Sequence, residues 1–296
     1  MKLPNIFLDR TTVLLLGVGV GSAIGFSFLG GAGPASSAPP PSYAVSKADS
    51  GVTEIVEALQ PAQRQLLETL KEGRPVRIAV FGDSFGDGVA FGLQQQLTGK
   101  AGYEVLKFSQ PATGFTRYKR LNLEDRASEQ LGSDPIDIAV ISFGANDAQG
   151  IITDKGEYAA LLSPKWCDQI GKRIDRFVAL LRAHNAMVYW VGLPRMRDGT
   201  LDRDVMGINL FYAQRMAALG VPFIDTRPVA SDAKGQFADY LPDPVTGART
   251  LVREGDGIHM SMTGYKWITR SLSDRIRRYV DAGRKLYANS ASAARR

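Results

Sequence analysis

A serine, a carboxylate and a histidine stand in two short stretches of this sequence. Ser84 lies in the stretch GDSFG, directly after an apolar run at residues 76–81, and Asp256 and His259 lie in the stretch DGIH near the C-terminus. A serine hydroxyl becomes a good nucleophile when a base takes its proton. A carboxylate three residues before the histidine can fix the ring tautomer of that base. The spacing therefore predicts Ser84 as nucleophile, His259 as general base and Asp256 as the group that orients His259.

The choice of base is narrow because the chain has only two histidines, His184 and His259. His184 ends a predicted helix, and an interaction with that helix terminus explains it without a catalytic role. The other residues also have structural interpretations. Ser84 stands where a helix N-cap is common, and Asp256 stands in a turn before a helix.

Two further positions could stabilise the negative charge that develops during attack on an ester. Gly114 follows a second apolar run, and Asn146 follows a third, in the stretch GAND. The backbone N–H groups of Ser84 and Gly114, with the side-chain amide of Asn146, would form an oxyanion hole. Glycine and Asn-Asp pairs are also ordinary turn residues, so a purely structural role stays open for both.

Short apolar runs alternate with helical periodicity along the chain. The sequence predicts strands at residues 76–81, 103–108, 136–143, 187–191 and 222–224, and helices at residues 53–71, 86–97, 166–184, 203–219 and 263–280. This alternation indicates a parallel sheet covered on both faces. In such sheets sites form beyond the carboxyl ends of the strands, where the candidate residues stand. Residues 232–253 break the rhythm, and a turn or small hairpin is expected at residues 243–247.

Other kinds of site fit the sequence less well. GDSFG matches the nucleophile elbow of α/β-hydrolases, but here it follows the first strand rather than a later one. The glycines of residues 82–88 have a spacing used by nicotinamide enzymes, but Asp83 would oppose a pyrophosphate. A metal site built on Asp83, Asp147, Asp256 and His259 is disfavoured because the chain has few histidines. We therefore expect no cofactor and no metal.

In these four blocks the chain resembles the SGNH (GDSL-type) hydrolase family. The blocks are Gly82-Asp83-Ser84, Gly114, Gly144-Ala145-Asn146-Asp147 and Asp256-Gly257-Ile258-His259. The stretches VGLP and VREGDGIH also resemble an exported bacterial branch catalogued as a domain of unknown function. The first block departs from the family pattern because it reads Ser84-Phe85-Gly86, which affects the acyl pocket more than the chemistry.

The resemblance implies a three-layer α/β/α sandwich with a five-stranded parallel sheet, of flavodoxin-like topology. It also implies hydrolysis or transfer of an acyl group through an acyl-serine. Ser84, Asp256 and His259 would then be the catalytic triad, and Ser84, Gly114 and Asn146 the oxyanion hole.

The N-terminal segment has the pattern of an export signal. Lys2 and Arg10 precede an uncharged stretch whose apolar part, residues 13–29, is long enough for a tilted membrane helix. We expect residues 1–32 to be a membrane anchor or a signal peptide, residues 33–52 a Gly/Ala/Ser/Pro-rich linker, residues 53–285 the hydrolase-like domain and residues 286–296 a basic tail. The protein would be periplasmic, anchored in the inner membrane if the segment is retained and secreted if it is cleaved.

The charge distribution limits the partners that we expect, and the cysteine content limits the disulfides. The net charge is +6, and basic residues gather near the C-terminus, as on a solvated helix face or a surface for anionic glycan or lipid. No motif of nucleic-acid recognition is present, so no nucleic acid is expected. The single cysteine, Cys167, cannot form an internal disulfide and is expected to be a buried structural thiol.

The combined interpretation is an exported serine esterase or acyltransferase. Its expected substrate is an O-acyl group, specifically O-acetyl, on cell-envelope carbohydrate, or another small ester. The alternatives are a non-catalytic scaffold or glycan-binding module on a hydrolase fold, and a lipase or thioesterase for longer acyl chains.

Overall fold

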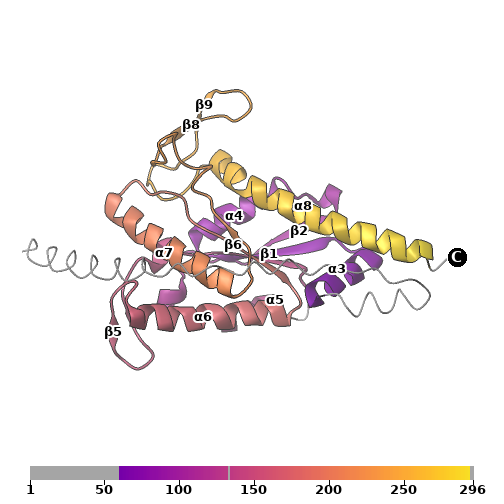
Figure 1. The fold of residues 1–296 in the computed structure, drawn as a ribbon, viewed down its shortest axis with the longest axis horizontal. Coiled ribbons are helices and arrows are strands. Elements are labelled where there is room, and N and C mark those ends of the chain that lie inside the picture. Colours follow the sequence, from indigo (N-terminus) through magenta and orange to yellow (C-terminus); the bar gives the residue numbers. More distant parts are fainter. Residues whose placement is uncertain (1–59, 133, 294–296) are drawn as a thin grey trace, which may run out of the picture. The chain divides into compact units, whose positions relative to one another are not determined.

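The computed structural model of the chain describes residues 60–132 and 134–293. A five-stranded parallel sheet lies at its centre (Figure 1). Its strand order is β2-β1-β3-β6-β7. The strands are β1 (Val76–Gly82), β2 (Tyr103–Lys107), β3 (Ile138–Ser142), β6 (Met187–Val191) and β7 (Phe223–Ile224). The order reverses between β1 and β3, so the crevice expected of an open α/β sheet lies at their carboxyl ends.

Helices cover both faces of this sheet and form two separate cores. α3 (Pro61–Lys71), α4 (Ser84–Gln94) and α8 (Met262–Ala293) pack with the side chains of one face. α5 (Leu123–Leu131) and α6 (Pro164–Ala183) pack with the other face, and α7 (Gly199–Ala218) contributes to both cores. The predicted five-stranded α/β/α sandwich is confirmed.

Strand β1 shows why the sheet must be covered on both sides. Ile78 and Val80 belong to one core, and Ala79 and Phe81 belong to the other. Six of its seven residues are buried, and only Arg77 is partly exposed. A continuous apolar run of this kind is typical of a strand that is buried on both faces.

The helices that follow begin at local signals. Ser163 caps α6 with its hydroxyl, which accepts a hydrogen bond from the Trp166 N–H, and Pro164 occupies the first helical position. Asp198 caps α7 by accepting hydrogen bonds from the N–H groups of Thr200 and Leu201. Each cap fixes where a helix begins after its strand.

Some elements differ from the sequence-based expectations. The predicted hairpin is confirmed as β8 (Tyr240–Pro242) and β9 (Arg249–Leu251). Helix α5 and a second hairpin, β4 (Ile151–Ile152) with β5 (Tyr158–Ala159), were not expected. Helix α8 continues to Ala293, so most of the segment expected as a basic tail is helical.

The expected membrane anchor and linker, residues 1–52, lie outside the described residues, as does the start of the helix expected from residue 53. Among the helices of residues 60–132 and 134–293, none combines the length and the apolar character needed to span a bilayer.

Candidate active site

Ser84 stands at the sharp turn from β1 to α4. The Asp83 side chain caps this helix by accepting a hydrogen bond from the Phe85 N–H at 2.9 Å, so Ser84 is the first helical residue and not the cap. At the first position of a helix a backbone N–H has no acceptor within the helix, and the helix dipole favours negative charge there. A Cβ on Gly82 would lie 2.3 Å from the Ser142 carbonyl oxygen, so the turn requires glycine.

The turn before α8 brings His259 to this serine. The Ser84 hydroxyl donates to His259 Nε2 at 2.8 Å, and His259 Nδ1–H donates to Asp256 Oδ2 at 2.6 Å. This tautomer leaves Nε2 as an acceptor. The structure thus joins the three residues that the sequence singled out, across 175 positions of the chain.

The Asp256 carboxylate is held in its charged form. Its second oxygen, Oδ1, accepts hydrogen bonds from the backbone N–H groups of Ile258 at 2.8 Å and His259 at 3.0 Å. Partial burial raises the pKa of Asp256, but the hydrogen bonds from His259 and from Ile258 outweigh burial and lower it to about 2. Asp256 is therefore an anion across the physiological range, which stabilises an imidazolium at His259.

His184 lies elsewhere in the fold. It caps the C-terminus of α6, and its backbone N–H donates to the Leu180 carbonyl at 3.3 Å. The next strand, β6, begins at Met187, so His184 stands at the amino-terminal edge of the sheet, away from Ser84. This place agrees with the structural interpretation of His184.

Gly114 and Asn146 lie on loops that meet beside Ser84. Asn146 Nδ2 donates to Asp83 Oδ2 at 3.2 Å and to the Thr113 carbonyl at 3.0 Å, so it joins the residue before Ser84 to the residue before Gly114. The sequence predicted that this amide would point at an oxyanion. In the structure both of its N–H groups are engaged within the protein, and the amide fixes the spacing of the two loops.

The buried carboxylate of Asp147 stabilises the loops that carry Gly114 and Asn146. Asp147 Oδ1 accepts hydrogen bonds from the Thr116 N–H and hydroxyl, both at 2.8 Å, and Oδ2 accepts from the Tyr212 hydroxyl at 2.9 Å. A Cβ on Gly114 would lie 2.5 Å from Asp147 Oδ1. Gly114 is thus required for close approach rather than for a turn, and burial raises the pKa of Asp147.

Asp83 is a second buried carboxylate, exposed by only 1 %. Burial raises its pKa to about 6, against the opposing effect of the Phe85 N–H. The sequence suggested Asp83 and Asp147 as candidate metal ligands, and Asp83 as a residue that would oppose a pyrophosphate, but it suggested no supporting role for them beside Ser84. The sequence did contain a signal for such a role, because Asp83 directly precedes Ser84 and Asp147 directly follows Asn146. Within the residues that the structure describes, no three His, Cys, Asp or Glu side chains are grouped to hold a metal.

Two arginines that the sequence did not single out hold the loop of Asp256 and His259. The Arg253 guanidinium, exposed by only 1 %, donates through Nη2 to the carbonyls of Ile258 at 3.1 Å and Gly257 at 3.3 Å. Arg197 Nη1 donates to the Gly255 carbonyl at 2.7 Å. Burial lowers the pKa of Arg253 to about 10. Its buried charge gave no signal in the sequence because arginine is normally an exposed residue.

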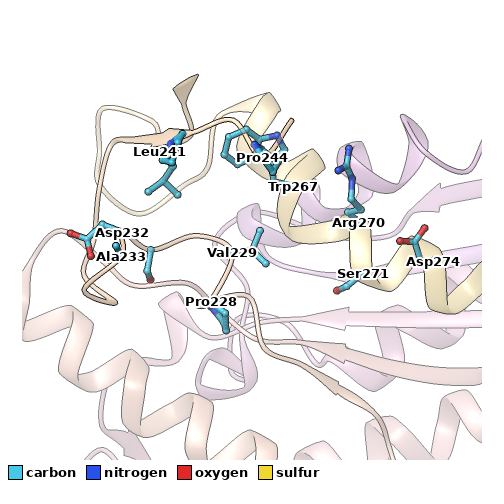
Figure 2. Close-up of a pocket in the computed structure, with 12 residues that line it drawn as sticks. Pro228, Val229, Asp232, Ala233, Leu241, Pro244, Trp267, Arg270, Ser271 and Asp274 are labelled. Atoms are coloured by element: carbon cyan, nitrogen blue, oxygen red, sulfur yellow. The ribbon is translucent and has the colours of Figure 1, made fainter. Parts of the chain in front are cut away.

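A groove of about 620 Å³ lies between the segment after β7, the β8–β9 hairpin and α8 (Figure 2). Trp267, Arg270 and Asp274 from α8 line it, with Pro244 from the hairpin. None of Ser84, Asp256 and His259 lines this groove.

Comparisons with known proteins give one family match. The family described as "Protein of unknown function (DUF459)" matches residues 77–275. This span includes Ser84, Gly114, Asn146, Asp256 and His259. None of the curated proteins compared with the sequence matches it.

Several solved structures are similar to the chain at low identity. A GDSL-like lipase from Bacteroides thetaiotaomicron is 16 % identical, with a TM-score of 0.47, over 78 % of this chain and 95 % of that one. The aryl esterase of M. smegmatis is 16 % identical, with a TM-score of 0.47, over 69 % and 99 %. Est24, a carbohydrate acetylesterase from Sinorhizobium meliloti, is 15 % identical, with a TM-score of 0.46, over 68 % and 97 %.

Proposed function

We propose that this chain, which belongs to the DUF459 family, is a serine ester hydrolase or acyltransferase that forms an acyl-Ser84 intermediate. The observation that carries the proposal is the continuous hydrogen-bond chain from Ser84 through His259 to Asp256, with distances of 2.8 and 2.6 Å. If Ser84 had only a structural role and Asp256 only a role in a turn, no histidine would need to link their side chains. Nucleophile, base and orienting carboxylate in direct contact are the arrangement that acyl transfer requires.

The first step forms the acyl-enzyme. Ser84 Oγ attacks the ester carbonyl carbon while His259 Nε2 takes the hydroxyl proton, and the carbonyl electron pair moves to oxygen. In this proposal the backbone N–H groups of Ser84 and Gly114 donate to the oxyanion. The Asn146 side chain, which binds Asp83 and the Thr113 carbonyl, supports the spacing of the two loops. The oxyanion then collapses and breaks the ester C–O bond. The leaving alkoxide takes the proton from His259.

The second step regenerates the enzyme. A water molecule or a sugar hydroxyl attacks the acyl carbon and gives its proton to His259. Collapse of the second oxyanion releases Ser84, which takes that proton back. With water the product is a free acid, and with a sugar hydroxyl it is a new ester. Both outcomes use the same residues.

We further propose that the substrate is an O-acetyl ester of cell-envelope carbohydrate and that the protein acts in the periplasm. The support is the N-terminal pattern of Lys2 and Arg10 before a long uncharged stretch. Protease treatment of intact spheroplasts tests the location. We expect the domain to be degraded without lysis of the inner membrane, and full protection would refute export.

Hydrolysis of 4-nitrophenyl acetate by the purified full chain tests the chemistry. We expect Ser84→Ala and His259→Gln to abolish turnover, while His184→Gln keeps it. Mass spectrometry of the intact wild-type protein should detect one added acetyl group on Ser84. Full activity of Ser84→Ala, or failure of a serine-directed phosphonate to label Ser84 in folded protein, would reject the proposed mechanism.

A further inference from the structure

A basic pocket of about 350 Å³ adjoins the loops of Gly114 and Asn146. None of the nine residues that line it is acidic. Four of them are cationic: Arg117, Lys119, Arg120 and Arg173. A concave surface that carries charge of one sign focuses the electric field and concentrates ions of the opposite sign. The pocket therefore has the electrostatics of an anion site.

The pocket shares its wall with the proposed reaction centre. Gln149, which lines the pocket, donates through Nε2 to the Asn146 carbonyl at 2.7 Å and to Thr116 Oγ1 at 3.1 Å. Thr116 also lines the pocket and follows Gly114 by two residues. The cationic wall thus adjoins the two loops that carry Gly114 and Asn146.

Arg173 provides a fixed charge in this wall. Its side chain is only 5 % exposed, donates from Nη1 to the Phe115 carbonyl at 2.7 Å and pairs through Nη2 with Asp154 at 2.6 Å. Its Nε has no hydrogen-bond partner within the residues that the structure describes. A buried guanidinium anchored at two points cannot turn away from the pocket as a surface lysine can.

The other three cations carry the unbalanced charge. Arg117 Nη1 donates to the Ala112 carbonyl at 3.0 Å, which is a neutral acceptor. Lys119 and Arg120 are exposed. Arg117, Lys119 and Arg120 form no ion pair with any described residue. Like charges on one wall repel each other, and a bound anion relieves that repulsion while forming charge-assisted hydrogen bonds.

We infer that this pocket binds an anionic substituent, a carboxylate or a phosphate, on the alcohol part of the ester substrate. The inference rests on the proposed function and specifies its substrate class, namely acyl esters of acidic carbohydrate. The charge belongs to the alcohol part because an acetyl group carries none. Guanidinium groups suit both anions, since their paired N–H donors match two oxygen acceptors.

A matched pair of substrates tests the inference: O-acetylated methyl glucuronide and O-acetylated methyl glucoside, acetylated at the same ring position. They differ only at C6, which is a carboxylate in the first and a hydroxymethyl group in the second. We expect the wild type to favour the glucuronide in kcat/KM. In the double variant Lys119→Ala/Arg120→Ala we expect the ratio of the two kcat/KM values to fall about tenfold or more, chiefly through KM for the glucuronide. Added salt should reduce the wild-type preference.

The matched control is Lys285→Ala, which removes one exposed positive charge from the far end of α8. It should keep the wild-type ratio. An unchanged ratio in the double variant, or an equal loss for both esters, would overturn the inference. Circular dichroism checks that the double variant is folded, and both of its mutated side chains are exposed.

Failure of the proposed function is distinguishable from failure of this inference. If the wild type hydrolyses neither ester, calorimetry with methyl glucuronide and with methyl glucose 6-phosphate still reports on the pocket. Binding of either anion that is lost in the double variant supports the inference and identifies the preferred anion. Binding of neither anion, with retention on phosphatidylglycerol vesicles instead, refutes it and indicates a lipid surface.

Discussion

Asp83 should make the protein less stable as the pH rises. The residue directly precedes the proposed nucleophile, and burial raises its pKa from the ordinary 3.8 to about 6. The folded state therefore holds the Asp83 proton more tightly than the unfolded state does. Between these two pKa values the folded chain binds more protons, so the free energy of unfolding falls as the pH increases.

The expected size follows from the shift. A difference of about two pKa units corresponds to about 3 kcal/mol, at about 1.4 kcal/mol per unit. This penalty develops gradually as the pH rises from below 3.8 to above 6. About 2 kcal/mol of it should develop between about pH 4.5 and 7.5. Asp83→Asn cannot ionise and should lack this contribution, whatever its absolute stability.

Urea unfolding of the wild type and of Asp83→Asn at several pH values measures the effect. We expect the difference in unfolding free energy between the two proteins to shift by about 2 kcal/mol in favour of Asp83→Asn as the pH rises through this window. The control is Asp168→Asn, which removes a carboxylate with a side chain 64 % exposed and should follow the wild-type profile. A difference between wild type and Asp83→Asn that is independent of pH would refute the reasoning.

Two further predictions concern turnover of 4-nitrophenyl acetate. Asp256→Asn keeps the shape of the carboxylate but not the charge that stabilises an imidazolium, so kcat should fall by about 10⁴; a loss below about tenfold would show that Asp256 is not the orienting group. Gly114→Ala places a Cβ 2.5 Å from Asp147 Oδ1 and must displace its loop, so kcat should fall by about 10² to 10³. Gly99→Ala, which meets no atom within 4 Å, should behave as wild type, and equal activity of the two alanine variants would contradict this role for Gly114.

The parts of the fold that the sequence predicted well are those with strong local patterns. Continuous apolar runs located the five strands of the sheet, and the order of strands and helices indicated where their carboxyl ends meet. The spacing of Asp256 and His259 also predicted a local contact, because three residues span a single turn. These features depend on neighbours in the chain, so periodicity and spacing can reveal them.

The parts that were missed depend on contacts between distant segments. The amide of Asn146 is directed by Asp83 and by the Thr113 carbonyl, and neither partner can be inferred from the GAND stretch alone. Tyr212 reaches Asp147 across 65 residues.

Helix α5 was also missed, although it did carry a local signal in the sequence. Leu123, Ala127 and Leu131 are buried at four-residue spacing, and Asn122 caps the helix.

The separation of 175 positions between Ser84 and His259 has a consequence for synthesis of the protein. Helix α4, which begins at Ser84, packs against α8, which begins three residues after His259. During translation Ser84 emerges long before His259, the proposed base, and the contact between them forms only after His259 and α8 have been made. If Ser84 is the nucleophile as proposed, a nascent or C-terminally truncated chain holds an unactivated alcohol, and it should cleave no esters before the whole domain has folded.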